Sequence, residues 1–227
     1  MQNRLWQRIG CELSGNPFNA RVPLKNEQGK PRNPFINAGA IAVADRLLPH
    51  GNGVGTLPEL LSSLCFESVH LDPEVAQSGA DTGFRNHAVA NFMKGFGKLD
   101  NPVVAVLDLY FYQCAIRINC QQMARAAVYL CRDGRHSDRA DGVVLTESQA
   151  RCVNALMLTC GTYDAAGEFV YRIGLPCKSG VGGGIVAVVP DQLTLCVWPP
   201  ALDASGNSLL GMHALELFTA RTGLLIF

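Results

Sequence analysis

A lysine, a serine and four glycines stand together in segment 178–184, which reads KSGVGGG. Glycines let a backbone approach a ligand closely and point its amide N–H groups at that ligand. Amides held in this way stabilise the oxyanion that develops during acyl transfer. A glycine-rich strand entry is also typical of a bulge or a tight turn, and Lys178 could be a surface charge. By itself, the segment leaves these interpretations open.

The elements around this segment are predicted from their periodicity. Gly184–Val189 and Leu193–Trp198 are strand-like runs separated by Pro190-Asp191-Gln192, which predicts an antiparallel hairpin. The first thirty-odd residues are rich in Gly, Pro and Asn, and we expect them to be extended or looped. Helices are expected over Asn37–Leu48, Thr56–Phe66, 102–118, Cys120–Asp133, 146–160 and Asn207–Thr222.

Two of these helices carry more specific predictions. Helix 102–118 is apolar on all sides and should be buried, with Leu107 inaccessible to solvent. In the last helix we expect an inward stripe, which consists of Leu210, Ala214, Leu217 and Phe218. Many helices followed by a late hairpin predict an α+β fold, with helices packed on an antiparallel sheet.

Composition narrows the class of protein. The chain has 227 residues, 48% of them hydrophobic and 17% charged, and no linker divides it, so we expect a single domain over 1–227. Its net charge is zero, and the stretch Arg132–Arg139 alternates with acids, which indicates a solvated loop rather than a nucleic-acid surface. No run reaches the ~20 apolar residues of a membrane span. The N-terminus lacks a signal-peptide core, so we expect a cytoplasmic protein.

Nine cysteines are spread along the chain. Their number is odd and none form a Cys-x-x-Cys pair, which favours buried thiols in a reducing compartment. We therefore expect neither a disulfide framework nor a metal site, and no cofactor.

Four blocks, in this order, carry a specific resemblance. They are PRNPFINAGAIAV (31–43), Leu109-Tyr110-Phe111 with Cys114 following, CGTYDAAGEFVYRIGLPCKSGVGGGIVAVVP (160–190) and the ending NSLLGMHALELF. Over essentially its whole length the chain resembles the serine-dependent glutaminase family. That resemblance implies a β-lactamase/penicillin-binding-like fold, in which Lys-Ser-Gly is a signature strand. It also implies hydrolysis of L-glutamine to L-glutamate and ammonia through an acyl-enzyme, and a homotetramer.

The resemblance also implies roles for five residues. Asn37 and Asn86 match asparagines that contact the substrate, and Tyr110 matches a tyrosine at the amino-acid end of glutamine. Tyr163 matches the tyrosine that relays protons between nucleophile and leaving ammonia, and Val181 matches the residue whose backbone N–H helps form the oxyanion hole. Two carboxamides and a phenol can hold a zwitterionic amino acid without adding net charge.

Each of these residues also has a purely structural interpretation. Asn37 could be the N-cap of its helix, and Asn86 could cap a helix running to Met93. Tyr110 on an apolar helix could be a core residue, and Tyr163 could lie in a loop. Only their joint occurrence in the four blocks favours the functional interpretation.

Two departures from the family pattern matter. The family's acidic substrate contact falls on Gly79, and Asp81 is near it but out of register. The family's nucleophile and base lie in a Ser-x-x-Lys turn, whereas no Ser, Thr or Cys here stands three residues before a lysine. Leu5–Gly10 resembles family sequence shortly after that turn. We therefore expect the chain to begin just downstream of the nucleophile and to be inactive alone.

Two alternatives follow. The chain could be a catalytically inactive remnant or pseudo-subunit that keeps oligomerisation or weak glutamine binding, which Gly79 and the missing turn favour. It could also be a cysteine amidohydrolase, although no cysteine lies at an activating helix start near a histidine.

Overall fold

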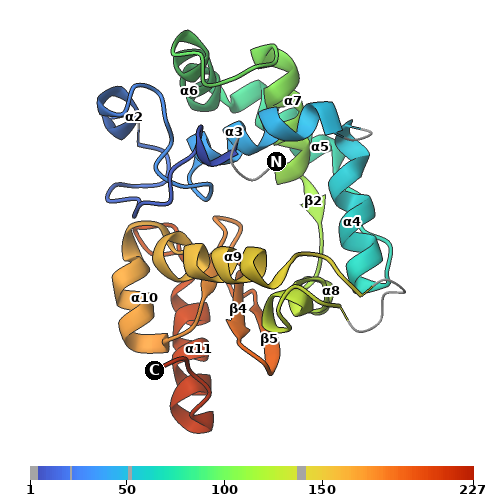
Figure 1. Ribbon diagram of the computed structural model, residues 1–227, viewed down its shortest axis with the longest axis vertical. Coiled ribbons are helices and arrows are strands. Elements are labelled where there is room, and N and C mark those ends of the chain that lie inside the picture. The colour runs from blue at the N-terminus through green and yellow to red at the C-terminus, as the bar shows by residue number, and fades with distance from the viewer. Residues whose placement is uncertain (1–4, 21, 51–52, 137–141) are drawn as a thin grey trace. The chain divides into compact units, whose positions relative to one another are not determined.

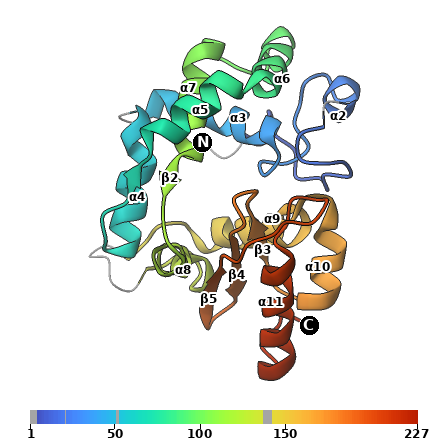
Figure 2. The same cartoon turned by 180° about the vertical axis from the view of Figure 1, so that it is seen from behind.

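Helices dominate the structure, and the named strands of its described part pair antiparallel (Figures 1 and 2). The computed structural model describes residues 5–20, 22–50, 53–136 and 142–227. The chain divides into two compact units, one formed by Met1–Ser62 with Ser68–Ile118 and the other by Ser63–Glu67 with Asn119–Phe227. The predicted α+β class is confirmed.

The first unit is built around helix α7. Its elements are α2 (Val22–Asn26), α3 (Asn37–Leu47), α4 (Thr56–Cys65), β1 (His70–Leu71), α5 (Pro73–Thr82), α6 (Phe84–Gly95), α7 (Val103–Cys114) and β2 (Ile116–Arg117). Only the part of α4 up to Ser62 belongs to this unit. Helices α3, α5 and α6 each pack against α7. Ile41, Met93 and Leu107 are fully or almost fully buried in the core between them. Residues far apart in sequence therefore meet on one central helix.

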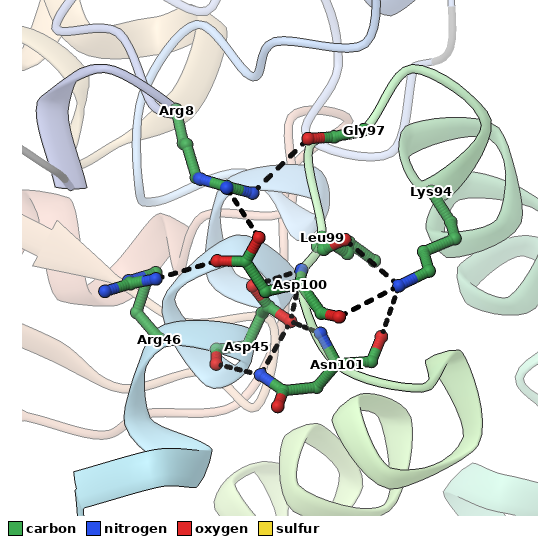
Figure 3. Close-up of polar contacts among 8 residues, drawn as sticks. All are labelled: Arg8, Asp45, Arg46, Lys94, Gly97, Leu99, Asp100 and Asn101. Carbon is green, nitrogen blue, oxygen red and sulfur yellow. Dashed lines mark hydrogen bonds and ion pairs between the residues drawn. The ribbon is translucent and has the colours of Figure 1, made fainter.

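A buried carboxylate joins α3 to the loop between α6 and α7 (Figure 3). The Asp45 side chain is fully buried and accepts hydrogen bonds from the backbone N–H groups of Asp100, at 3.0 Å, and Asn101, at 2.8 Å. The Asn101 side-chain amide donates to the same carboxylate at 3.0 Å. The Asp100 carboxylate in turn pairs with Arg8 at 2.6 Å and Arg46 at 2.8 Å. This network fixes the turn that leads into α7.

Removal of that carboxylate should destabilise the protein. Asp45→Ala leaves the Asp100 and Asn101 donors buried without an acceptor, so we expect a loss of about 2–4 kcal/mol in the free energy of unfolding. Asp81→Ala is the control, because Asp81 is exposed and pairs only locally with Gln77 at 2.8 Å. Urea unfolding measures the free energy of unfolding of both variants. Equal midpoints for the two variants would contradict a structural role for Asp45.

The second unit contains the three-stranded sheet, whereas β1 and β2 of the first unit form a two-stranded one. Strands β3 (Cys177–Ser179), β4 (Ile185–Val189) and β5 (Leu193–Val197) lie in the order β3-β4-β5, with Ser179 opposite Ile185 and Ile185 opposite Val197. The predicted hairpin is thus confirmed. The helices are α8 (Cys120–Ala127), α9 (Glu147–Cys160), α10 (Ala166–Ile173) and α11 (Leu209–Thr222). In both views α10 and α11 lie side by side, and α8 lies beside β5.

Several predicted boundaries were wrong. Helix 102–118 ends at Cys114 because the chain then enters strand β2, and Val104 is 68% exposed although Leu107 is buried as expected. The α-helix predicted for Cys120–Asp133 stops at Ala127 and continues as a 3-10 turn, Val128–Cys131. The N-terminal region, expected to be looped, contains the short helix α2.

The inward face predicted for the last helix was wrong for Leu210, Ala214 and Leu217, which are exposed, whereas Phe218 is partly buried and packs against the core of the second unit. Helix α11 buries Gly211, Met212, Leu215 and Thr219. Leu210 and Leu217 are 55% and 41% exposed. Apolar residues surround this helix, so periodicity alone could not select the face that packs on the sheet.

Within the described residues, no helix is long and apolar enough to cross a membrane. The charged stretch Arg132–Arg139 lies partly outside the described residues. Its described arginines, Arg132 and Arg135, are exposed.

Candidate functional site

In the first unit, two of the predicted site residues contact each other. The Asn37 side-chain amide donates a hydrogen bond to the Asn86 side-chain oxygen at 3.0 Å, although 49 residues separate them. Asn37 is the first residue of α3, whose N-cap is Ile36, and Asn86 lies in the first turn of α6, whose N-cap is Gly83. Neither asparagine is therefore a helix cap. Both are partly accessible, so this carboxamide pair can offer further donors and acceptors to a ligand.

Tyr110 lies in the same unit, on α7. It is 8% exposed, and its ring meets that of Phe111 edge to face at 5.5 Å. Desolvation raises the pKa of the Cys114 thiol, one turn further along the helix, and its hydrogen bond with the Tyr110 side chain lowers that pKa by a smaller amount. Tyr110 therefore has a packing role, and its contact with substrate stays a prediction.

Gly79 and Asp81 lie on different sides of α5. A Cβ at Gly79 would meet the Phe111 ring at 3.2 Å, so Gly79 faces α7. Asp81 is two residues, and thus about 200°, further round the helix, exposed and hydrogen-bonded to Gln77. Asp81 therefore does not take the place of an acidic side chain at position 79.

In the second unit, a close backbone approach positions Tyr163. Helix α9 ends at Cys160, and the carbonyl of Gly161 accepts a hydrogen bond from the Ser179 N–H at 3.0 Å. A side chain at Gly161 would collide with the Cys177 carbonyl, so only glycine fits between α9 and β3. Tyr163 follows with φ +62°, a left-handed conformation that is uncommon for a tyrosine. Strain of this kind is concentrated at functional sites.

The Tyr163 hydroxyl meets Lys178 and the strand backbone. Tyr163 is 6% exposed and donates to the Ser179 carbonyl at 2.9 Å. The Lys178 ammonium donates to the Tyr163 hydroxyl at 3.4 Å and to the Ser179 carbonyl, and it lies 4.6 Å from the centre of the tyrosine ring. A phenol and an amine in contact form a path along which a proton can move.

Desolvation changes the protonation of Lys178. Part of the residue is accessible, but its ammonium is enclosed by Tyr163 and the strand, and burial lowers its pKa from 10.5 to about 7. The carbonyl acceptor and the ring face favour the charged form and oppose this shift. Lys178 can consequently accept or donate a proton near neutral pH.

This shift predicts a pH-dependent stability. Between pH 7 and pH 10.5 the unfolded chain binds more protons at Lys178 than the folded chain, so the free energy of unfolding should rise with pH across that window. Below pH 7 the full cost of burying the cation is present. Relative to Lys178→Met, the native chain should gain roughly 2–4 kcal/mol from pH 7 to pH 10.5. Lys25→Met, at an exposed position of α2, should parallel the native chain. Parallel curves for Lys178→Met and the native chain would exclude the shift.

The glycine segment forms a turn between β3 and β4. The Gly180 N–H donates to the Gly184 carbonyl and the Gly183 N–H to the Gly180 carbonyl, both at 2.9 Å. The Trp198 indole N–H donates to the Gly182 carbonyl at 2.7 Å. Val181, at the tip, is 50% exposed, and its backbone N–H has no hydrogen-bond partner among the described residues. That amide can receive an anionic oxygen.

Ser179 points away from this arrangement. It is fully buried, and adjacent strand residues face opposite sides of a sheet, so its hydroxyl lies on the other face from the Lys178 side chain. Ser179 is therefore poorly placed to act as a nucleophile.

Sequence reasoning missed two positioning residues. Trp198 holds the glycine turn through the hydrogen bond from its indole N–H to the Gly182 carbonyl. Asn207 is fully buried, and its side-chain amide donates a hydrogen bond at 3.2 Å to the carbonyl of Thr162, the residue before Tyr163. Asn207 is the first residue of the family-like block NSLLGMHALELF, and this position in the block is the sequence signal that could have identified it. Tyr163, Lys178 and Val181 lie in the second unit, and Asn37, Asn86 and Tyr110 in the first.

Comparison with known proteins identifies the family. A family model described as Glutaminase matches residues 1–227. The chain is 54% identical to a glutaminase of Streptomyces coelicolor over 98% of its own length and 73% of that protein. It is 51% identical to a glutaminase of Methylorubrum extorquens over 99% of its own length and 74% of that protein.

Solved structures agree with this result. A probable glutaminase of Bacillus subtilis is similar with a TM-score of 0.90 and 33% identity, covering 99% of this chain and 76% of that one. A Bacillus subtilis glutaminase covalently bound to 5-oxo-L-norleucine, formed by reaction with 6-diazo-5-oxo-L-norleucine, has a TM-score of 0.85 and 32% identity, covering 99% and 74% of the two chains. The predicted β-lactamase-like fold is thereby confirmed, and the chain belongs to the glutaminase family of amidohydrolases.

Proposed function

We propose that this chain supplies the substrate-holding and oxyanion-stabilising parts of an enzyme that hydrolyses L-glutamine to L-glutamate and ammonia through a serine acyl-enzyme. Its two compact units would act as one catalytic domain. The observation that carries the proposal is the contact of Lys178 with the Tyr163 hydroxyl beside a turn whose Val181 amide is unbonded in the described residues. The serine nucleophile and its lysine would come from residues outside these 227.

The proposed chemistry has two steps. The serine oxygen attacks the side-chain amide carbon of glutamine, and the developing oxyanion accepts a hydrogen bond from the Val181 N–H. The Tyr163 hydroxyl gives a proton to the departing ammonia, and it regains one from the attacking serine or from Lys178. Water then attacks the acyl-enzyme and releases glutamate. Asn37, Asn86 and Tyr110 would hold the amino-acid end of the substrate.

A relative that forms a covalent complex supports the proposed acyl-enzyme intermediate. The Bacillus subtilis glutaminase, 32% identical to this chain, reacts with 6-diazo-5-oxo-L-norleucine to form a covalent complex. That compound carries a reactive diazoketone where glutamine has its amide. Attack by an enzyme nucleophile at that end of the molecule is the chemistry proposed here for glutamine.

The direct test is an ammonia-release assay on the purified 227-residue chain. We expect no readily measurable hydrolysis of glutamine, because binding and oxyanion stabilisation without a nucleophile leave rates orders of magnitude below the full site. A chimera that joins the chain to the Ser-x-x-Lys segment of a full-length relative should recover activity. Turnover by the 227-residue chain at an ordinary enzymatic rate would overturn the proposal.

A pseudo-subunit is the second candidate, and Gly79 favours it. Position 79 lacks the acidic side chain of the family, and Asp81 faces elsewhere on α5. A chimera that folds and includes Ser-x-x-Lys but still releases no ammonia would support this candidate. The resemblance further suggests a homotetramer in the cytoplasm, and sedimentation of the chimera would test its oligomeric state.

A further inference from the structure

Helix α8 and strand β5 are joined by a side-chain contact outside the proposed catalytic residues. The Thr194 hydroxyl, on β5, donates a hydrogen bond to the Ala124 carbonyl of α8 at 2.7 Å. The helix packs closely along the strand, and it lies beside β5 in both views (Figures 1 and 2). This contact fixes which residues of the two elements face each other.

The same register brings two cysteines together. Cys120 lies one helical turn before Ala124, and Cys196 lies two strand residues after Thr194, on the same side of the strand. One helical turn and two strand residues span similar distances, about 6 Å and about 7 Å. After burial, the neighbouring Cys120 side chain is the main cause that raises the pKa of Cys196, which indicates that the two thiols lie close enough to interact. Both residues are partly accessible, so small reagents can reach them.

We propose that Cys120 and Cys196 form a reversible modification site, which a peroxide oxidises to a disulfide between α8 and β5. The two cysteines lie on elements that pack against each other, next to the Thr194–Ala124 hydrogen bond, and each is held by a regular element. Bond formation therefore requires side-chain rotation rather than unfolding. This inference is independent of the glutaminase chemistry.

The oxidation can be written as two balanced steps. Cys196 keeps its proton, because burial and then the neighbouring Cys120 raise its pKa to about 12. In the proposed first step, the Cys120 sulfur takes one oxygen of hydrogen peroxide; the O–O bond breaks and water leaves. The Cys196 sulfur then attacks the Cys120 sulfenic acid, the S–S bond forms, and the sulfenic oxygen leaves as a second water with the Cys196 proton. Two thiols and one peroxide yield one disulfide and two waters.

Peptide mapping tests the site. The chain is treated with hydrogen peroxide, its remaining thiols are alkylated, and the tryptic peptides are weighed. We expect a cross-linked pair that contains Cys120 and Cys196, lighter by two hydrogens than the separate peptides, which a thiol reductant restores. Cys152→Ser is the control, because Cys152 is exposed on α9; it should give the same cross-link.

A second variant tests the order of the steps. In Cys196→Ser the sulfenic acid on Cys120 has no resolving thiol, so labelling by dimedone should increase at least several-fold over the native chain. Cross-linking of Cys120 to a different cysteine, or full alkylation of both residues after peroxide treatment, would overturn the proposal. If Cys196→Ser does not fold, the peptide map of the native chain alone tests whether Cys120 and Cys196 form the disulfide.

Discussion

Tyr163→Phe should reduce glutamine hydrolysis by about 10²–10⁴-fold in the chimera that carries a Ser-x-x-Lys segment. The substitution removes the hydroxyl that contacts Lys178 at 3.4 Å and the Ser179 carbonyl at 2.9 Å, while it keeps the buried ring. A proton relay needs the hydroxyl and not the ring. The loss should therefore appear in kcat, measured by ammonia release.

Tyr171→Phe is the matched control for that experiment. Tyr171 lies on α10 and is 90% exposed, so loss of its hydroxyl should leave kcat unchanged. Thermal unfolding of both variants separates a catalytic loss from a folding defect. Wild-type kcat in a folded Tyr163→Phe variant would remove Tyr163 from the proposed relay.

Gly161→Ala should have the largest effect on stability. The new Cβ would collide with the Cys177 carbonyl and lie 2.5 Å from the Met157 carbonyl oxygen. Both are backbone atoms of regular elements, so neither can move without breaking the contact of α9 with β3. We expect a loss of about 3 kcal/mol or more in the free energy of unfolding. For a chain of this size that lowers the melting temperature by roughly 6–12 °C.

A glycine-to-alanine substitution at an uncrowded helix position should have the opposite effect on the free energy of unfolding. A Cβ at Gly167, inside α10, meets nothing within 4 Å. Gly167→Ala should therefore stabilise the protein by about 0.5–1 kcal/mol, since alanine loses less backbone entropy in a helix. Similar melting temperatures for the two variants would contradict the close approach of Gly161 to β3.

Local signals in the sequence determined much of the fold. A capping box of Thr146 and Gln149 starts α9, the helix predicted over 146–160, and the runs on either side of Pro190-Asp191-Gln192 form β4 and β5. These features depend on residues only a few positions apart, so the sequence contains them completely. The absence of a Ser-x-x-Lys turn within the 227 residues is likewise a fact of sequence alone.

Only the tertiary structure decided which residues meet. It paired Asn37 with Asn86 instead of leaving either as a cap, and it turned Leu210 and Leu217 of α11 outward. It also placed Gly161 against β3, which brings Tyr163 to Lys178. Such contacts depend on how distant backbones pack, and apolar periodicity does not specify packing when a helix is apolar on several sides. The sequence therefore determined the elements and the family, whereas long-range packing decided the geometry of the candidate site.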